Sequence, residues 1–260
     1  MQIPLMRLGL LCSTTVLLAA CASAPKDISL IPTQTDSITS KEGVFTQPLK
    51  YELSKPNCEG TCPKIQVDSL IFPGNRVFTD FIDKELANMA GFDSRIAPRG
   101  SIQEFIDYYW VQAGDKDQTI LSAKTRYRNK NLTVLELGAW QYMTGAAHGM
   151  SVIQLLNWDN QSNQPIRFDQ IVLPNQHKAF EQRLREAHQK WLQTQDAYLD
   201  NPEDYARLWP FYATQNIALT DAGIVAKYNS YEIAPYSSGQ PELFIPYTEL
   251  RGILQPKYLP

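Results

Sequence analysis

The chain has 260 residues, and its 24 basic and 27 acidic residues give a formal net charge of −3. A mildly acidic chain lacks the excess of positive charge with which proteins bind phosphate backbones, so we expect no nucleic-acid partner. The same charge would help to attract a basic protein. With 43% hydrophobic residues, the chain can bury one full core or two closely joined subdomains.

The first twenty residues, 1–20, have the features of a lipoprotein signal peptide. Arg7 precedes a short apolar run, and Leu18-Ala-Ala-Cys21 closes the segment. Small residues directly before a cysteine are typical of lipoprotein processing, in which Cys21 is diacylated and becomes the mature N-terminus; a plain secretory signal is the alternative. Ala22 and Ser23 stand where an inner-membrane retention signal usually has Asp, which resembles outer-membrane lipoproteins of Gram-negative bacteria. We therefore expect a lipid anchor at the periplasmic face of the outer membrane, without a spanning helix.

Residues 21–43 are rich in Ser, Thr, Pro and Lys and predict a flexible linker from the membrane to the folded part. The folded part begins near Val44 and extends to residue 260. It forms either one domain or subdomains over about 44–115 and 116–260.

The four cysteines constrain the redox chemistry. Cys12 leaves with the signal peptide and Cys21 is lipidated, so Cys58 and Cys62 remain. In an oxidising periplasm such a pair predicts a disulfide that closes a small loop. A redox-active or metal-binding pair is the alternative. A thioredoxin-like site, however, has two residues between its cysteines, and no nearby spacing supplies further zinc ligands.

The first half of the folded part predicts a strand, two helices and three further strands. Residues 65–72 alternate as a strand does. Residues 75–90 place apolar side chains on one helical face, namely Val77, Phe78, Phe81, Ile82 and Leu86. A second helix begins at Ser101, with Glu104 three residues later as a capping box. Its inward side chains are Ile102, Phe105, Ile106 and Tyr109. The three strands follow at about 118–128, 132–142 and 151–158.

The second half continues with a helix over about 175–193, which carries His177 and His188. Their separation of eleven positions is too large to share a metal ion, and we expect both to be solvated. A short helix is expected within 196–213. The remaining segments read as two strands, at 216–219 and 224–228, a loop over 234–239, and a final helical turn over 248–254. Two or three helices packed on an antiparallel sheet make the fold class α+β.

A glycine-bearing corner lies between two of the expected strands, in the stretch Trp140-Gln-Tyr-Met-Thr-Gly-Ala-Ala-His-Gly-Met150. Gly145 and Gly149 permit a tight turn, and the alanines between them keep side-chain bulk low. His148 is therefore expected on a compact platform. A packing role for the whole hairpin is the alternative.

The run Tyr142-Met-Thr-Gly-Ala-Ala-His-Gly149 resembles the Y-x-T-G-G-A-H signature of the RsiV-like domain, the extracytoplasmic domain of an anti-sigma factor that senses lysozyme. The segments 231–239 and 244–250 are similar to the same family, in the right order and separation. Ala146 replaces the second glycine of the signature. The resemblance covers about residues 45–255 and implies a face that binds lysozyme or peptidoglycan. It implies partner-binding roles for Tyr142, Thr144, Gly145, His148, Gly149, Tyr231, Pro235 and Tyr236.

The sequence lacks the familiar catalytic patterns, including the Gly-x-Ser-x-Gly nucleophile elbow, the His-Glu-x-x-His zinc helix and the phosphate-binding glycine loop. The three histidines have no ligand spacing, so we expect neither a metal nor another cofactor, and no enzyme. The alternatives are a cell-wall hydrolase or deacetylase-like enzyme and a structural envelope protein without a specific ligand. With no spanning or cytoplasmic segment in view, we do not expect an anti-sigma factor.

Overall fold

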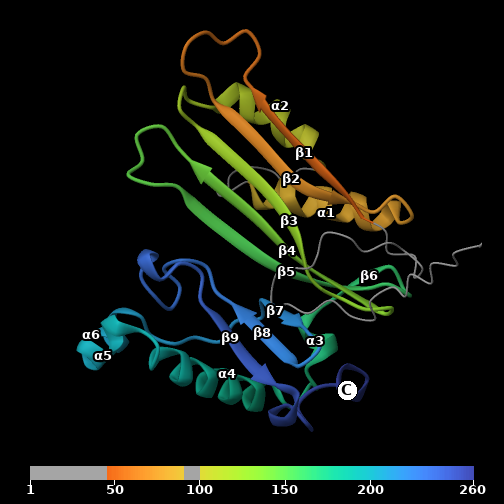
Figure 1. Cartoon of the computed structure of the whole chain (residues 1–260), viewed down its shortest axis with the longest axis vertical. Coiled ribbons are helices and arrows are strands. Elements are labelled where there is room, and N and C mark those ends of the chain that lie inside the picture. Colours follow the sequence, from red (N-terminus) through yellow and green to blue (C-terminus); the bar gives the residue numbers. More distant parts are fainter. Residues whose placement is uncertain (1–45, 91–99) are drawn as a thin grey trace, which may run out of the picture.

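A computed structural model describes residues 46–90 and 100–260 of the chain (Figure 1). The expected signal peptide, the lipidated Cys21 and the linker lie outside the described residues. Within them, no helix combines the length and the apolar character needed to cross a bilayer.

Six strands form the larger of two sheets, in the order β1-β2-β3-β4-β5-β6. Their bounds are β1 (Gln47–Ser54), β2 (Lys64–Ile71), β3 (Gln118–Arg128), β4 (Leu132–Tyr142), β5 (Met150–Asp159) and β6 (Gln164–Ile166). Neighbouring strands are antiparallel except β2 and β3, which are parallel. The expected α+β class is confirmed, and the parallel pair is an addition to it. It arises because two helices connect β2 to β3 and return the chain to the end of the sheet at which β2 began.

The two connecting helices, α1 (Arg76–Met89) and α2 (Ile102–Gln112), pack on one face of the large sheet (Figure 1). Ser101 caps α2 by accepting the N–H of Glu104, whose carboxylate in turn accepts the N–H of Gly100. In the core between helices and sheet, the Trp158 ring stacks on Phe78 with the centroids 4.3 Å apart. The apolar side chains predicted to face inward do so, except Val77, which is 58% exposed because it lies beside the buried stripe of α1.

The smaller sheet is antiparallel and has the strands β7 (Ile217–Leu219), β8 (Gly223–Lys227) and β9 (Glu242–Pro246). Its main helix is α4 (His177–Leu192), which packs against β9 on the side away from the large sheet (Figure 1). The shorter helices are α3 (Phe168–Ile171), α5 (Asp196–Asp200) and α6 (Pro202–Leu208), and single 3-10 turns are η1 (Tyr236–Ser238), η2 (Tyr247–Glu249) and η3 (Pro256–Tyr258). The two sheets do not correspond to the possible subdomains over about 44–115 and 116–260. Strand β2 lies before residue 115 and β3 after residue 116, and the two strands pair in one sheet.

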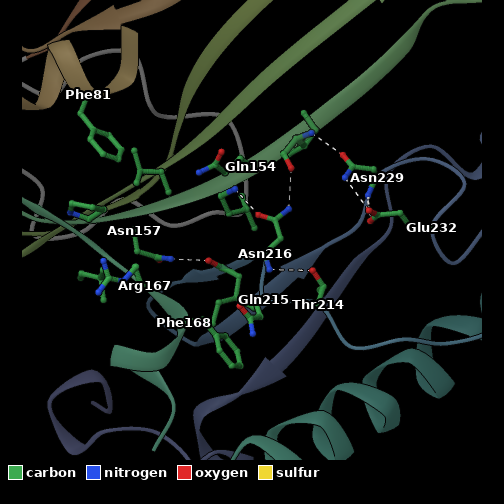
Figure 2. A pocket seen from close by; sticks show the side chains of 16 residues that line it. Phe81, Gln154, Asn157, Arg167, Phe168, Thr214, Gln215, Asn216, Asn229 and Glu232 are labelled. Atoms are coloured by element: carbon green, nitrogen blue, oxygen red, sulfur yellow. Dashed lines mark hydrogen bonds between the residues drawn. The ribbon is translucent and has the colours of Figure 1, made fainter. Parts of the chain in front are cut away.

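The two sheets meet where β5 faces β7, and asparagine side chains join them (Figure 2). Buried Asn157 on β5 donates to the carbonyl of Ile217 at 2.7 Å and accepts the N–H of Leu219 at 2.8 Å. In the opposite direction, Asn216 accepts the N–H of Leu155 and donates to the carbonyl of Ile153. Each amide thus offers one donor and one acceptor to the backbone of the other sheet, so the facing strand edges stay hydrogen-bonded without strand pairing.

A cluster of alternating charges also connects the sheets. Lys227 on β8 donates to Glu136 on β4 and to Glu242 on β9, each at 2.9 Å. Arg126 on β3 bonds both carboxylates, at 2.6 and 2.9 Å. Burial acts to raise the pKa of Glu242, but hydrogen bonding and charge from Lys227 and Arg126 outweigh it and lower that pKa.

His188 on α4 corrects the expectation of a solvated histidine. The residue is 2% exposed, and neither ring nitrogen has a hydrogen-bond partner among the described residues. The ring packs beside Phe211 and Trp191, with centroid distances of 5.2 and 5.9 Å. Burial, and then the positive charge of Arg185, lower the pKa of His188 to about 4.

This histidine should make the fold less stable in acid. The unfolded chain takes up a proton at His188 below about pH 6.5, whereas the folded chain resists it until about pH 4. Stability is therefore lost as the pH falls through this window. We expect the free energy of unfolding to be about 2 kcal/mol lower at pH 5 than at pH 8 through this residue. Urea unfolding of His188→Phe should not show this loss of stability between pH 8 and pH 5. The control His177→Phe, which alters an exposed histidine, should still show it. An unchanged pH dependence in His188→Phe would contradict the assignment.

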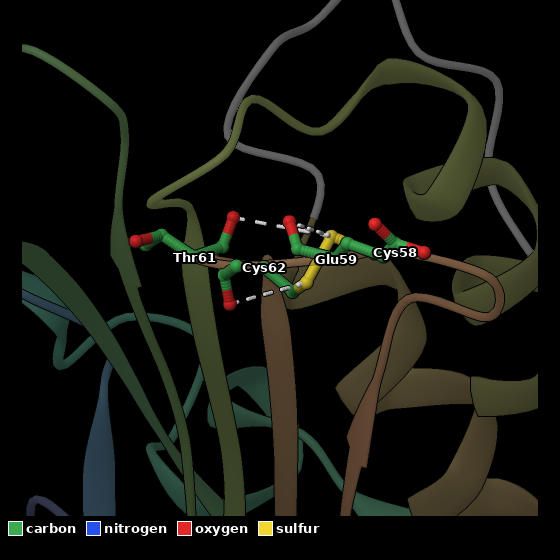
Figure 3. The surroundings of a disulfide bond; sticks show 5 residues. Cys58, Glu59, Thr61 and Cys62 are labelled. Atoms are coloured by element: carbon green, nitrogen blue, oxygen red, sulfur yellow. Dashed lines mark hydrogen bonds between the residues drawn. A yellow bond between two sulfur atoms is a disulfide. The ribbon is translucent and has the colours of Figure 1, made fainter.

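The β1–β2 connection contains the disulfide predicted from the cysteine count (Figure 3). The sulfur atoms of Cys58 and Cys62 are 2.07 Å apart, and the bond closes a loop of five residues at one end of the large sheet. Covalent closure restricts the conformations of the unfolded chain there.

Candidate functional site

The connection between β4 and β5 is a glycine-bearing corner, as the sequence predicts. Gly145 has a φ of +90°, a conformation that L side chains rarely adopt. The preceding Thr144 is fixed by two hydrogen bonds, because its N–H and its hydroxyl both donate to Asp117, at 2.6 and 2.7 Å. Asp117 is almost fully buried at the start of β3. The corner is therefore anchored to the neighbouring strand.

A second loop, residues 229–240, lies against this corner although it is distant in sequence. Asn229 accepts the N–H of Ile153 on β5 at 2.7 Å, and Gln240 donates to the hydroxyl of Ser151 at 3.0 Å. Tyr231 has a φ of +71°, which is uncommon for a residue with a side chain. Hydrogen bonds at both ends hold the loop to the outer edge of β5.

His148 of the corner and two tyrosines of the loop form what we call the ring cluster, defined as His148, Tyr231 and Tyr236. The His148 and Tyr236 rings lie 4.5 Å apart between centroids, and the two tyrosine rings 5.6 Å apart. The Tyr231 hydroxyl lies 3.2 Å from Nε2 of His148. Gly149 supplies the shared acceptor, because its carbonyl lies 2.9 Å from Nδ1 of His148 and 3.3 Å from the Tyr236 hydroxyl.

These contacts assign the hydrogens of His148. A carbonyl oxygen only accepts, so Nδ1 carries the hydrogen that bonds Gly149. In the neutral ring Nε2 is then an acceptor, and the Tyr231 hydroxyl donates to it. All three ring side chains are consequently held by hydrogen bonds while they remain exposed.

Gly149 also sets how close the corner lies to the sheet. A β-carbon at this position would lie 2.2 Å from the indole ring of Trp140 on β4. Only glycine lets the backbone rest on that ring without displacing it. Trp140 was not among the predicted site residues, although it opens the stretch on which the prediction was based.

The exposed surface continues from the ring cluster toward α6. The Trp209 ring lies beside Tyr231, with the centroids 6.2 Å apart and the planes inclined by 28°. Leu208 is 58% exposed next to it, and Met143 of the corner is 55% exposed. Neither Trp209 nor Leu208 was predicted as a site residue, because exposure of an apolar side chain cannot be read from its type.

The structure places the predicted site residues in two groups. His148, Gly149, Tyr231 and Tyr236 are in mutual contact. Thr144 and Gly145 shape the corner, Tyr142 is half-buried at the end of β4, and Pro235 precedes η1, the 3-10 turn that carries Tyr236. The first group is exposed except for Gly149, and the second supports it.

The chemistry of the site favours binding. Rigid aromatic side chains with apolar faces and polar tips are the side chains that dominate protein interfaces, because they lose little entropy when a partner binds. In the residues that the structure describes, no group of three or more His, Cys, Asp and Glu side chains is arranged to hold a metal ion. The fold and site thus define an α+β protein with an exposed, hydrogen-bonded ring cluster at the junction of two sheets.

Comparison with known proteins gives the family. The model of DUF3298, described as a protein of unknown function, matches residues 169–248. A DUF3298 family protein from Pseudomonas aeruginosa, known from a crystal structure, is 32% identical and has a TM-score of 0.76, over 84% of this chain and 97% of that chain. The chain therefore belongs to the DUF3298 family.

A member of the same family from Bacteroides fragilis has a similar fold at lower identity. It is 18% identical, with a TM-score of 0.63, and the match covers 84% of this chain and 96% of that chain. No curated protein matches the chain. A distant member of the family therefore shares the fold.

Proposed function

We propose that this protein is a periplasm-facing envelope lipoprotein whose domain captures a protein partner, with lysozyme as the partner to test first. The observation that carries the proposal is the ring cluster. Three exposed rings from segments more than eighty positions apart are fixed by hydrogen bonds into one surface. Such preorganisation lowers the entropic cost of binding. The resemblance of the same segments to the RsiV-like domain supports lysozyme as the ligand.

We further propose that the domain binds without turnover. The His148 nitrogens are both engaged, one with a carbonyl and one with the Tyr231 hydroxyl, and among the described residues no serine, threonine or cysteine side chain is bonded to either. The His148→Ala variant separates the two roles. Loss of affinity alone favours capture, whereas loss of a cell-wall-degrading activity in a folded variant would favour an enzyme.

Isothermal titration calorimetry of residues 26–260 with lysozyme tests the binding proposal directly. We expect a Kd in the micromolar range or tighter. We also expect weaker binding at higher salt, because an acidic chain and a basic partner attract each other. Peptidoglycan fragments serve as the parallel titrant. Heat from the fragments alone would replace lysozyme by the cell wall as the partner, and heat from neither would contradict the proposal.

The lipid anchor rests on the sequence from Leu18 to Cys21, and we propose that it holds the domain at the outer membrane. Metabolic labelling with palmitate tests it. The wild-type chain should take up label and sediment with outer membranes. The Cys21→Ala variant should do neither, and a labelled variant would show that the lipid is attached elsewhere.

A further inference from the structure

A cavity of about 570 Å³ opens at the junction of the two sheets, and its lining includes none of the three ring-cluster side chains (Figure 2). The outer edge of β5, the segment around α3 and the start of β7 form most of its wall, and Phe81 of α1 completes it. The volume lies within the range of pockets for small organic ligands, about 300–1,000 Å³. The cavity is therefore large enough for a mono- or disaccharide.

The cavity does not suit an added peptide strand. Such a strand would need free backbone groups on the edge of β5. The N–H and carbonyl of Ile153 and the N–H of Leu155 are already bonded to the side chains of Asn229 and Asn216. The amide side chains of Asn216 and Asn229 thus occupy these backbone groups of β5, and the same two side chains form part of the cavity wall.

The polar lining is rich in side chains that both donate and accept. Amides and a hydroxyl line the wall at Gln154, Asn157, Thr214, Gln215, Asn216 and Asn229. The bonds to backbone use only part of the capacity of Asn157, because a primary amide has two hydrogens and two lone pairs. Asn216 donates both of its hydrogens to backbone carbonyls and keeps one lone pair for a ligand. A ligand with several hydroxyl groups, each of which also donates and accepts, matches such a wall. Phe81, which is half-buried, adds a flat apolar surface on which the C–H face of a sugar ring can rest.

Two charged side chains line the cavity, and only one is available to a ligand. Glu232 is occupied, since it accepts the N–H and the side-chain amide of Asn229 at 2.6 and 3.1 Å. Arg167 is exposed and forms no ion pair with a carboxylate in the described parts of the chain. A guanidinium of this kind can bind a carboxylate through two parallel hydrogen bonds.

We propose that this cavity binds a small acidic carbohydrate, a mono- or disaccharide with one carboxylate, with Arg167 holding the carboxylate and the amide wall holding the hydroxyls. A divalent cation does not fit, because Glu232 is engaged and the remaining wall is neutral apart from Arg167. A polyphosphate would require more positive charge than one guanidinium. Carbohydrate binding here does not require protein capture by the ring cluster, although Asn229 both lines the cavity and holds the loop 229–240 to β5.

Two amino sugars test the proposal: N-acetylmuramic acid, which carries its carboxylate on a lactyl ether at O3, and the neutral N-acetylglucosamine, which has a free hydroxyl there. Each is titrated into the lipid-free chain, residues 26–260, and followed by ¹⁵N-resolved NMR. We expect the acidic sugar to bind at least about 10-fold more tightly, since only its carboxylate can form a charge-assisted bond with Arg167. The side-chain amide signals of Asn216 and Asn229 should shift during the titration.

The Arg167→Gln variant should bind the acidic sugar about 10-fold more weakly, with an affinity close to that of the neutral sugar. Arg251→Gln is the matched control, because Arg251 is exposed outside the cavity lining. The Gln215→Ala variant, which changes an exposed part of the wall, should bind both sugars more weakly than the wild type. Equal affinity of wild type and Arg167→Gln for the acidic sugar, or shifts confined to the corner around His148, would overturn the proposal, as would the absence of binding.

Discussion

Replacement of Asn157 by alanine is expected to lower the free energy of unfolding by about 3 kcal/mol. The side chain satisfies a carbonyl and an N–H of the small sheet and is almost fully buried. Its removal would leave both backbone groups buried without a partner, at a cost of about 1–3 kcal/mol each. For a domain of this size, the expected fall in Tm is about 10 °C. Thermal and urea unfolding measure both quantities.

Two further variants test whether the loss of these hydrogen bonds causes the destabilisation of Asn157→Ala. Asn157→Asp keeps the shape and the acceptor but cannot donate to Ile217 when ionised, so it should also be destabilised. Asn131→Ala changes an exposed asparagine and should alter stability by less than about 0.5 kcal/mol. A fully stable Asn157→Ala protein would show that the two sheets do not depend on this bridge.

Replacement of Tyr236 by alanine is expected to weaken lysozyme binding about 30-fold, or about 2 kcal/mol, while the fold persists. Tyr236 contacts the His148 ring and donates to the carbonyl of Gly149, so its loss removes both a contact surface and a support for the histidine. Calorimetry gives the affinity, and circular dichroism confirms that the variant is folded. The Tyr236→Phe variant should have an affinity for lysozyme between those of the wild type and Tyr236→Ala, because it keeps the ring and loses one hydrogen bond of 3.3 Å.

Phe244→Ala is the matched control for this experiment. Phe244 is 48% exposed, a larger fraction than the 38% of Tyr236, but it lies on β9 outside the ring cluster. Its replacement should change the affinity less than twofold. Equal losses in Phe244→Ala and Tyr236→Ala would mean that lysozyme senses general surface hydrophobicity and not the cluster.

Long elements with a strong hydrophobic pattern could be predicted from the sequence. The strands from 118 to 159 and the helix α4 lie within a few residues of their expected bounds. Strand β1 was missed although Leu49, Tyr51 and Leu53 alternate with polar residues. The alternating run is short, and only Leu49 and Tyr51 are half-buried in the structure. The parallel pairing of β2 and β3 was missed for another reason, since a strand pattern does not specify its neighbour or its direction.

The site was predictable only in part. The corner and the loop came from their resemblance to a known domain, and the structure brings them into contact. No spacing rule could place Tyr231 beside His148, which are 83 positions apart. The burial of His188 was also invisible in the sequence, because its helix has polar residues around it and the covering Phe211 comes from a later segment. Tertiary packing decides such positions.

The long separation within the ring cluster has a consequence for nascent and damaged chains. Tyr231 and Tyr236 reach His148 only when the loop of the small sheet is bonded to β5, through Asn229 and Gln240. A chain that has completed the large sheet but not the small one exposes the histidine without its tyrosines. The complete ring cluster therefore exists only in a chain in which both sheets are formed and joined.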